Sequence, residues 1–398
     1  MKIIVAPDSF KGSLSALRIC QLVAKAAAEV CPDAIVHSLP LADGGEGTAD
    51  ALLHALNGTE RTCSVHAPLG NEIPATYGIF REPSGTPATG SNRVSRNSTM
   101  DTENRIAIMD MASASGLTLI SDEQRDVLAA STYGTGEMIL DAINQSCRKI
   151  YIGLGGSATN DGGMGMAAAL GIRFLDCDGN LLPPVPNSMT KVDTIDLADL
   201  DPRISNTTIT IMSDVKNPLL GETGATYIYG PQKGVTDEQL PIVDAWMAHY
   251  IQKAEEATGK SVRDIEGAGA AGGLGAGLLA FTPAKIQSGI ETILYLLHFD
   301  ELLEDADFVI TGEGRMDYQS AFGKVVSGVG THCRAKKVPC YALVGSIGPG
   351  AEQLFEHGIT SILPTVDHIM PLSEAMANAD ELCYSAAVRM LRFVHHPY

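Results

Sequence analysis

The sequence predicts an α/β protein in which a second α/β domain is inserted into a doubly wound parallel-sheet domain. Both ends of the 398-residue chain alternate short β-branched runs with amphipathic segments, which is the pattern of a parallel sheet covered by helices. The middle breaks this alternation with short strands and many Gly and Pro residues. We therefore expect residues 1–61 and 285–398 to form the discontinuous domain and residues 62–284 to form the inserted one.

The N-terminal end reads as strand, helix, strand and helix. Residues 2–6 are rich in β-branched side chains, and the segment that follows repeats apolar residues at helical spacing, with Ser13 as the expected N-cap. A second strand is expected at 34–39 and a helix at 49–56, which Asn57 and Gly58 end. This order predicts parallel pairing, because parallel strands need a crossover connection.

The C-terminal end repeats the alternation, and the middle contains one long interruption. Buried strands are predicted at 307–311, 340–345 and 359–366, and a helix at 372–394 closes the chain. The polar run at 81–105 lacks apolar periodicity and is predicted to be a mobile excursion.

Composition excludes several classes of protein. The net charge of −19 argues against nucleic acid and against an anionic membrane as partners. The eight Cys residues include no C-x-x-C pair, which indicates a reduced, cytoplasmic protein without a disulfide framework or a zinc site. The first apolar run is too short for a signal peptide, and the Gly/Ala-rich stretch 267–284 is too weakly hydrophobic for a membrane span.

Two successive loops carry polar side chains after the first two predicted strands. Asp8, Ser9 and Lys11 follow the first strand, and "ADGGEGT", with Asp43 and Glu46, follows the second. Ligands of open parallel sheets bind outside the carboxyl ends of the strands, so both loops are expected at the binding edge. A single Asp at such a place is more often a turn or cap residue, but two such loops in succession raise the expectation of a ligand.

The stretch "GLGGSATNDGGMG" (153–165) follows a strand-like run and combines glycines with small polar residues. Bare backbone and small donors can surround a phosphate, and a helix that starts near Gly163 would add its positive end. The residues predicted to bind the cofactor are Gly155, Gly156, Ser157, Ala158, Thr159 and Asn160. A packed Gly-rich turn is the alternative reading.

The same stretch also imitates a dinucleotide fingerprint. Gly153, Gly155 and Ala158 match G-x-G-x-x-A, and Asp176 follows at a suitable distance. "TNDGG" continues directly after the match, where a dinucleotide-binding fold needs a helix already running. Because the match is only partial, a nicotinamide-dependent oxidoreductase acting on a small hydroxy acid is kept as the alternative function and not as the first one.

Two further loops carry charged residues. "MSDVKNPLLG" contributes Asp214, a candidate magnesium ligand, and "YGPQKG" contains Lys233. "TGEGRMDYQSAFGK" follows the strand at 307–311 and places two acids and two cations in one loop, an arrangement that is costly to desolvate without a ligand. Its candidate residues are Glu313, Arg315, Asp317 and Lys324.

Taken together, these residue types suit phosphoryl transfer. Lys11, Arg315 and Lys324 can neutralise a transferring phosphoryl group, and carboxylates can hold magnesium or accept a hydroxyl proton. The sequence contains neither a Walker G-x-x-x-x-G-K-[ST] motif nor the signature set of protein kinases.

The order of the motifs resembles the bacterial glycerate kinase family of the two-domain type. The matching stretches run from residue 3 to about residue 346 and are "APDSFKGSLSA", "LADGGEGT", "STYGTGE", "GGSATNDGG", "SDVKNPLLG", "GPQKG", "GAGAAGGLGAG" and "TGEGRMDYQS". The resemblance implies a discontinuous Rossmann-like domain, ATP and Mg²⁺, and D-glycerate as the acceptor that becomes 2-phosphoglycerate. It also implies an active site in the cleft between the domains. Two departures are the long run at 81–105 and Asp110, which stands where the family typically has Glu.

Within this resemblance we expect specific roles. Arg315 or Lys11 would bind the glycerate carboxylate, and Asp317, ahead of Asp43, would accept the hydroxyl proton. Mg²⁺ would be held by Asp214 or Asp161 while ATP lies along the loop from Gly155. The further residues expected to contact the substrate are Asp8, Ser9, Glu46, Glu313 and Lys324. Only the family favours the 2-hydroxyl over the 3-hydroxyl, a monomer and a homodimer are equally compatible with the sequence, and a ligand sensor without catalysis is a further alternative.

Overall fold

The computed structural model describes residues 1–42, 47–56, 58–81, 105–321 and 324–395. The chain forms two compact units. Unit 1 comprises residues 1–43, 50–57 and 288–398, and unit 2 comprises residues 44–49 and 58–287. The sequence predicts the two divisions at 61/62 and 284/285. The polar run at 81–105 falls almost wholly outside the described residues, and its flanking residues, Arg81 and Arg105, pair with each other in the sheet of unit 2.

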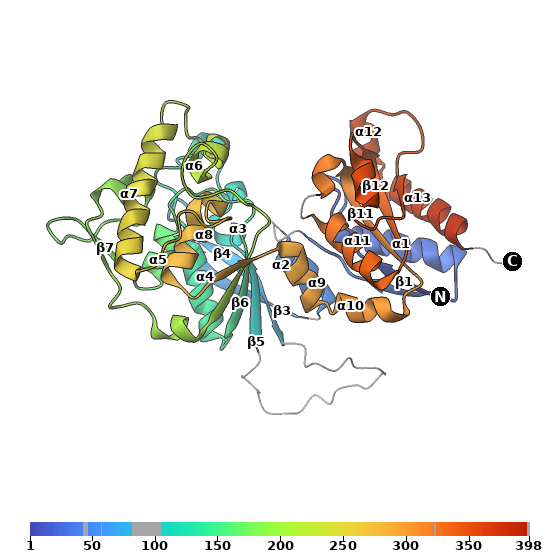
Figure 1. The fold of residues 1–398 in the computed structure, drawn as a ribbon, viewed down its shortest axis with the longest axis horizontal. Coiled ribbons are helices and arrows are strands. Elements are labelled where there is room, and N and C mark those ends of the chain that lie inside the picture. The colour runs from blue at the N-terminus through green and yellow to red at the C-terminus, as the bar shows by residue number, and fades with distance from the viewer. Residues whose placement is uncertain (43–46, 57, 82–104, 322–323, 396–398) are drawn as a thin grey trace. The chain divides into compact units, whose positions relative to one another are not determined.

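Unit 1 alternates strands and helices (Figure 1). Its elements are β1 (Lys2–Val5), α1 (Ala16–Val30), β2 (Ile35–Ser38), α9 (Gly289–Leu296), α10 (Phe299–Leu302), β11 (Phe308–Met316), α11 (Val325–Lys336), β12 (Cys340–Ile347), β13 (Ser361–Pro364), α12 (Leu372–Ala377) and α13 (Ala379–Val394). Helix α2 (Thr48–Ala55) has residues in both units.

The sheet of unit 1 has the strand order β13-β12-β11-β1-β2, and every adjacent pair is parallel. β1 is the joint between the two ends of the chain, because Ile3 pairs with Val36 of β2 and with Phe308 of β11. Helices α1 and α13 pack against each other and share one apolar core with β1, β11 and β12. Alternate strand residues point to the opposite face, where α11 packs on β11 and β12. The predicted parallel α/β fold is confirmed.

Three element predictions in unit 1 need correction. α1 starts at Ala16 with Ser15, not Ser13, as its N-cap, and the Ser15 hydroxyl accepts the amide hydrogen of Arg18 at 3.1 Å. β11 continues to Met316, five residues beyond the predicted end, because it pairs with β12 as far as Ile347. The predicted closing helix is two helices, with the break at Asn378.

Unit 2 is built on a mixed sheet. Its elements are β3 (Thr59–His66), β4 (Glu72–Arg81), β5 (Arg105–Asp110), α3 (Ala112–Ser115), α4 (Tyr133–Asn144), β6 (Lys149–Gly153), α5 (Met164–Ala169), β7 (Arg173–Leu175), β8 (Thr194–Asp196), β9 (Thr208–Met212), α6 (Ala225–Tyr229), α7 (Leu240–Thr258), α8 (Ala270–Phe281) and β10 (Lys285–Gln287). The strand order is β10-β9-β6-β5-β4-β3. β5, β6, β9 and β10 run parallel, whereas β4 is antiparallel to both of its neighbours.

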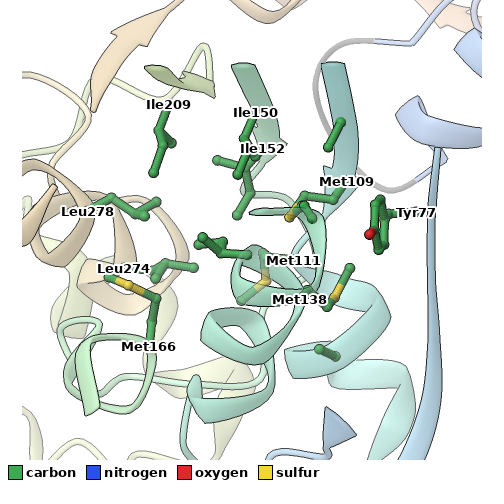
Figure 2. Close-up of a cluster of buried hydrophobic side chains, with 14 of the residues drawn as sticks. Tyr77, Met109, Met111, Met138, Ile150, Ile152, Met166, Ile209, Leu274 and Leu278 are labelled. Atoms are coloured by element: carbon green, nitrogen blue, oxygen red, sulfur yellow. The ribbon is translucent and has the colours of Figure 1, made fainter. Parts of the chain in front are cut away.

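Unit 2 has two large apolar cores and a small third cluster of Val127, Val235 and Val243 in the part of the chain that the structure describes. The first lies between the sheet and helices α4, α5 and α8, and Figure 2 shows Ile150, Ile152 and Ile209 of the strands near Leu274 and Leu278 of α8. The second packs α7 and α8 around the β7–β8 pair. None of the helices in the described part of the chain combines the length and the apolar character that a bilayer crossing requires.

Candidate active site

The carboxyl end of β1 lies against β11 in unit 1. The amide of Ala6 donates to the carbonyl oxygen of Ile310, and the amide of Asp8 donates to that of Gly312, both at 2.8 Å. The loop after β1 then passes close to Gly314, where a Cβ atom would lie 3.2 Å from the Cα of Phe10. Glycine at 314 permits this close approach of two backbones. The loop that contains Asp8, Ser9 and Lys11 is thereby fixed beside the β11 residues with predicted roles.

Glu313 is the most deeply buried acid of this edge. Its side chain is 7% exposed, and the Ser320 hydroxyl bonds its carboxylate. The second oxygen, Oε1, has no hydrogen-bond partner among the residues that the structure describes. The pKa of Glu313 is raised to about 7, chiefly by burial and to a smaller extent by the carboxylates of Asp8 and Asp317, while the Ser320 bond and the charge of Lys324 oppose the shift.

Arg315 and Asp317 close the same edge. The Arg315 guanidinium is largely exposed, and its Nε lies 3.4 Å from Oδ2 of Asp317. The other carboxylate oxygen of Asp317 accepts the amide hydrogen of Gln319 at 2.9 Å, and the Asp317 amide donates to the Ser320 hydroxyl at 3.2 Å. Both oxygens of Asp317 therefore already have partners within the chain.

The edge cluster of unit 1, which we define as Asp8, Glu313, Asp317, Ser320 and Lys324, is held together by three elements. Asp8 comes from the loop after β1, Glu313 from β11 and Asp317 from the residue directly after β11, and Lys324 is the residue before α11. Exposed Lys11 and Arg315 belong to the same two segments. Two other predicted residues, Asp43 and Glu46, lie outside the described residues.

In unit 2, the loop 154–163 joins β6 to α5 and is fixed on both sides. The amide of Ala158 donates to the carbonyl oxygen of Ser115 at 2.9 Å, and the amide of Gly162 donates to that of Gly272 at 3.0 Å. Gly156 has a φ of 73° and is exposed, whereas the loop beyond it is buried. The stretch is thus a braced loop whose tip consists of half-buried Gly155 and exposed Gly156.

Asp161 caps α5 from inside the protein. Its carboxylate is fully buried and accepts hydrogen bonds from the amide and hydroxyl of Thr132 and from the amides of Gly163 and Gly165, at 2.7 to 3.1 Å. Burial raises the pKa of Asp161, and these donors oppose the shift. The expectation that Asp161 holds a metal ion conflicts with this placement, because its oxygens point to donors of the chain.

The predicted anion-binding helix end also needs correction. The helix starts at Met164, as expected, but it has only six residues, and Asp161 already accepts two of its first amide hydrogens. Asn160 and Ser157 are equally engaged inside the protein: the Asn160 amide donates to Thr226 at 3.0 Å, and Ser157 accepts from a lysine. Among the described residues, Thr159 Oγ1 and Asn160 Oδ1 are buried without a hydrogen-bond partner, and the assignment of this loop to the cofactor stays a prediction.

Lys233 is that lysine, and it had no role in the sequence interpretation. Its Nζ is fully buried and donates to the Ser157 hydroxyl and to the Thr159 carbonyl oxygen, both at 2.7 Å. Burial lowers the pKa of Lys233 to about 7, and the nearby Asp161 opposes the shift. The motif "GPQKG" was the available signal, but no local pattern shows that its lysine lies under a loop more than seventy residues earlier.

Asp110 and Asp214 lie at the same edge of the sheet as this loop. Asp110 ends β5 and pairs in register with Gly153 of β6, and Met212 of β9 pairs with Gly153 from the other side. Asp214 follows two residues later and is half-buried. Asp110 accepts the amide hydrogens of Gly47 at 2.9 Å and of Ala49 at 3.4 Å, so it stabilises the start of α2.

The described residues contain neither a cluster of metal-binding side chains nor a dinucleotide fingerprint with its expected structure. Across the described ranges, no three His, Cys, Asp or Glu residues come together as a metal site. The helix after β6 begins only at Met164, eleven residues past the first Gly of the fingerprint. Asp176 forms a surface turn in which it accepts the amide hydrogen of Asn180 at 2.8 Å. The geometry that a dinucleotide phosphate requires is therefore missing from this loop.

The chemistry of the two constellations differs. Unit 1 offers a buried carboxylate, Glu313, with a raised pKa among further acids and three cations, which suits a small hydroxy acid. Unit 2 offers an exposed glycine tip next to a half-buried carboxylate, which suits a polyphosphate and its cation.

Known proteins resemble this chain over its full length. Residues 3–395 match the sequence profile of the glycerate kinase family. A "Glycerate kinase" of Halalkalibacterium halodurans is 43% identical over 97% of this chain and 96% of its own. A "Glycerate 2-kinase" of Escherichia coli is 41% identical over 96% of this chain and 95% of its own.

A solved structure agrees with these sequences. The crystal structure of a protein described as glycerate kinase 2 from Salmonella typhimurium LT2 superimposes with a TM-score of 0.85 at 38% identity, and it covers 99% of this chain and 98% of the other. The motif order, the fold and these matches agree, and the chain belongs to the glycerate kinase family.

Proposed function

We propose that this protein transfers the γ-phosphoryl group of ATP to the 2-hydroxyl of D-glycerate and releases 2-phosphoglycerate and ADP. The observation that carries the proposal is the family match over residues 3–395, together with the E. coli relative named glycerate 2-kinase at 41% identity. The chemistry of the described residues supports it, because phosphoryl transfer depends on cations and carboxylates in fixed positions.

The edge cluster of unit 1 is the proposed glycerate site. Lys11 or Arg315 binds the substrate carboxylate, and Lys324 adds positive charge beside the acids. A local group of cations is needed because the chain carries a net charge of −19 and the substrate is an anion. Asp8 and Ser9 contact the hydroxyl groups of the substrate, and an acid of the cluster accepts the proton. Asp317 was the sequence candidate for that acid.

The loop 154–163 of unit 2 is the proposed site for the phosphates of ATP. Gly155 and exposed Gly156 form its tip. Hydrogen bonds of Ala158, Asp161 and Lys233 hold that tip in place. Mg²⁺ is assigned to Asp214, since magnesium is usually held by one or two carboxylates plus substrate phosphates. Bound there, the cation neutralises phosphate charge. Asp43, the other carboxylate that the sequence singled out, lies outside the described residues.

The decisive experiment is ADP release measured by a coupled assay on a panel of short hydroxy acids, with the product identified by ³¹P NMR. We expect D-glycerate to give the highest kcat/KM and 2-phosphoglycerate to be the product. A product phosphorylated at the 3-hydroxyl would refute the regiochemistry, and binding of D-glycerate without ADP release would indicate a sensor. Thermal shifts with ATP-Mg²⁺ and with NAD separate a kinase from an oxidoreductase, because a ligand bound by the native state raises its melting temperature.

Replacing Lys11 tests the substrate end. We expect Lys11→Ala to raise the KM for D-glycerate about tenfold or more with a smaller change in kcat, since a cation that binds the carboxylate stabilises ground state and transition state alike. Lys25→Ala, at an exposed position of α1 in the same unit, is the matched control and should leave the KM unchanged. An unaltered KM in Lys11→Ala removes this residue from the substrate site.

A further inference from the structure

We propose that Glu313, rather than Asp317, is the general base that takes the proton of the glycerate 2-hydroxyl. This inference rests on the proposed function and names a residue for its central step. Three observations carry it: the burial of the carboxylate, its unpaired oxygen, and the charges that surround it.

The first observation is the position of Glu313 on a rigid element. The residue lies within β11, where it pairs in register with Val344 of β12, one residue after the Gly312 carbonyl that binds the amide of Asp8. Its backbone is therefore fixed on both sides. A base held on a strand keeps its angle to the reacting hydroxyl better than one on a mobile loop.

The second observation is that one buried oxygen of Glu313 has no hydrogen-bond partner among the described residues. Glu313 is more than nine-tenths buried, and its Oε1 has no hydrogen-bond donor among the described residues, while the Ser320 hydroxyl bonds the carboxylate. An unpaired buried carboxylate oxygen is costly unless another group meets it. A substrate hydroxyl, bound directly or through one water, is a donor that would satisfy it.

The third observation is the set of charges around this carboxylate. Asp8 from the loop after β1 and Asp317 from the end of β11 disfavour the ionised form, and Lys324 before α11 and the Ser320 hydroxyl favour it. Burial is the largest effect, and the pKa of Glu313 rises to about 7. A general base is most effective when its pKa lies near the working pH, because it is then both ionised and able to hold a proton.

Asp317 is less suited to the same role. Its Oδ1 accepts the amide hydrogen of Gln319, and its Oδ2 pairs with the Arg315 guanidinium. These bonds shape the turn after β11 and orient Arg315. Asp317 is therefore a positioning residue in this proposal.

The phosphoryl transfer moves one proton and exchanges one P–O bond for another. The Glu313 carboxylate removes the proton of the 2-hydroxyl, whose oxygen forms a bond to the γ-phosphorus of ATP. The bond from that phosphorus to the β,γ-bridging oxygen breaks, and ADP leaves with the electron pair. The protonated Glu313 then gives its proton to water, so that the products are 2-phosphoglycerate, ADP and one proton.

The test is the pH dependence of kcat for the full-length protein and for Glu313→Gln, with D-glycerate and ATP-Mg²⁺ saturating. We expect wild-type kcat to fall on the acid side with an apparent pKa near the value of about 7. Glu313→Gln should lower kcat about 100-fold or more, change the KM for D-glycerate by less than about threefold, and lack the acid limb. A structural role alone would not remove that limb.

Asp317→Asn, at the residue directly after β11, is the matched control. It should keep the acid limb and act mainly on the KM for D-glycerate, because Arg315 loses its partner. If the acid limb disappears in Asp317→Asn and persists in Glu313→Gln, Asp317 is the base and the inference is wrong. A Glu313→Gln protein with kcat within about tenfold of wild type also overturns it.

Two further outcomes are separable. If Glu313→Gln unfolds below the assay temperature, Glu313→Asp replaces it: a carboxylate withdrawn by one methylene should lower kcat about tenfold or more and keep the acid limb. An unchanged kcat in Glu313→Asp contradicts the role. If wild type releases no ADP with D-glycerate, the proposed function itself fails, and the role of Glu313 fails with it.

Discussion

At the scale of single residues, Lys233 is held where its charge is unfavourable. Burial lowers its pKa from 10.5 to about 7, although its Nζ donates to the Ser157 hydroxyl and the Thr159 carbonyl oxygen. Between pH 7 and pH 10.5 the unfolded chain therefore holds a proton that the folded protein lacks. Stability contributed by this group must rise with pH across that window, because the unfavourable buried charge is removed.

Urea unfolding of Lys233→Met and of wild type tests this at several pH values between about 7 and about 9.5, the lower part of that window. The free energy of unfolding of wild type minus that of Lys233→Met should increase by up to about 1.4 kcal/mol per pH unit. Lys216→Met, at an exposed position of the same unit, is the control and should show no such trend. A difference between wild type and Lys233→Met that stays constant with pH would show that Lys233 is not strongly desolvated.

At the scale of elements, the loop 154–163 depends on Asp161. Its carboxylate accepts hydrogen bonds from Thr132 and from the amides of Gly163 and Gly165. It therefore joins the start of α4 to the start of α5. Removing it leaves several buried donors without an acceptor, each at about 1–3 kcal/mol. The bracing of the loop, rather than metal binding, is the role that this arrangement favours.

We therefore expect Asp161→Ala to lower the free energy of unfolding by roughly 3 kcal/mol or more in the absence of Mg²⁺. Asp176→Ala is the matched control, because Asp176 also accepts backbone amide hydrogens but does so in an exposed turn. It should lower stability by less than about 1 kcal/mol. Urea unfolding followed by circular dichroism measures both. Equal, small losses without Mg²⁺ and a larger loss for Asp161→Ala only with Mg²⁺ would restore the metal interpretation.

The elements also show how far the sequence could be interpreted. Strands β1, β2 and β12 and helix α1 were predicted because their apolar residues alternate or repeat locally. The extension of β11 to Met316 was missed, since its polar residues look like a loop and only the pairing with β12 keeps them extended. The rule that loops follow the carboxyl ends of parallel strands predicted that the loop after β1 lies beside β11, and the backbone bonds of Ala6 and Asp8 to β11 agree with it.

The burial of polar side chains was the part that the sequence could not give. Asp161 and Thr132 are 29 positions apart, and Lys233 and Ser157 are 76 apart, so no window of sequence contains both partners. Glu313 was predicted as a substrate contact, but its unpaired oxygen and shifted pKa follow from the fold around β11. Such contacts are long-range, and composition and periodicity do not record them.

At the scale of the whole molecule, each unit has apolar cores of its own. One core joins α1, α13 and the sheet of unit 1, and among the described residues the apolar clusters of unit 2 contain no residue of unit 1. Unit 1 is nevertheless assembled from both ends of the chain, and β1 pairs with β2 from one end and β11 from the other. Its stability therefore depends on contacts that close the longest loop of the protein.

Two matched isoleucines test whether the units unfold separately. Ile4 of β1 and Ile152 of β6 are both fully buried, and each lies in a strand with a parallel neighbour on both sides. Ile4→Ala and Ile152→Ala should each lower local stability by about 2–5 kcal/mol. In native-state hydrogen exchange, Ile4→Ala should accelerate exchange in β1, β11 and β12 and leave β5, β6 and β9 unchanged, and Ile152→Ala should do the reverse. If either variant accelerates exchange in both sheets alike, the chain unfolds as one cooperative unit, since separate cores transmit a cavity only to the elements that they contact.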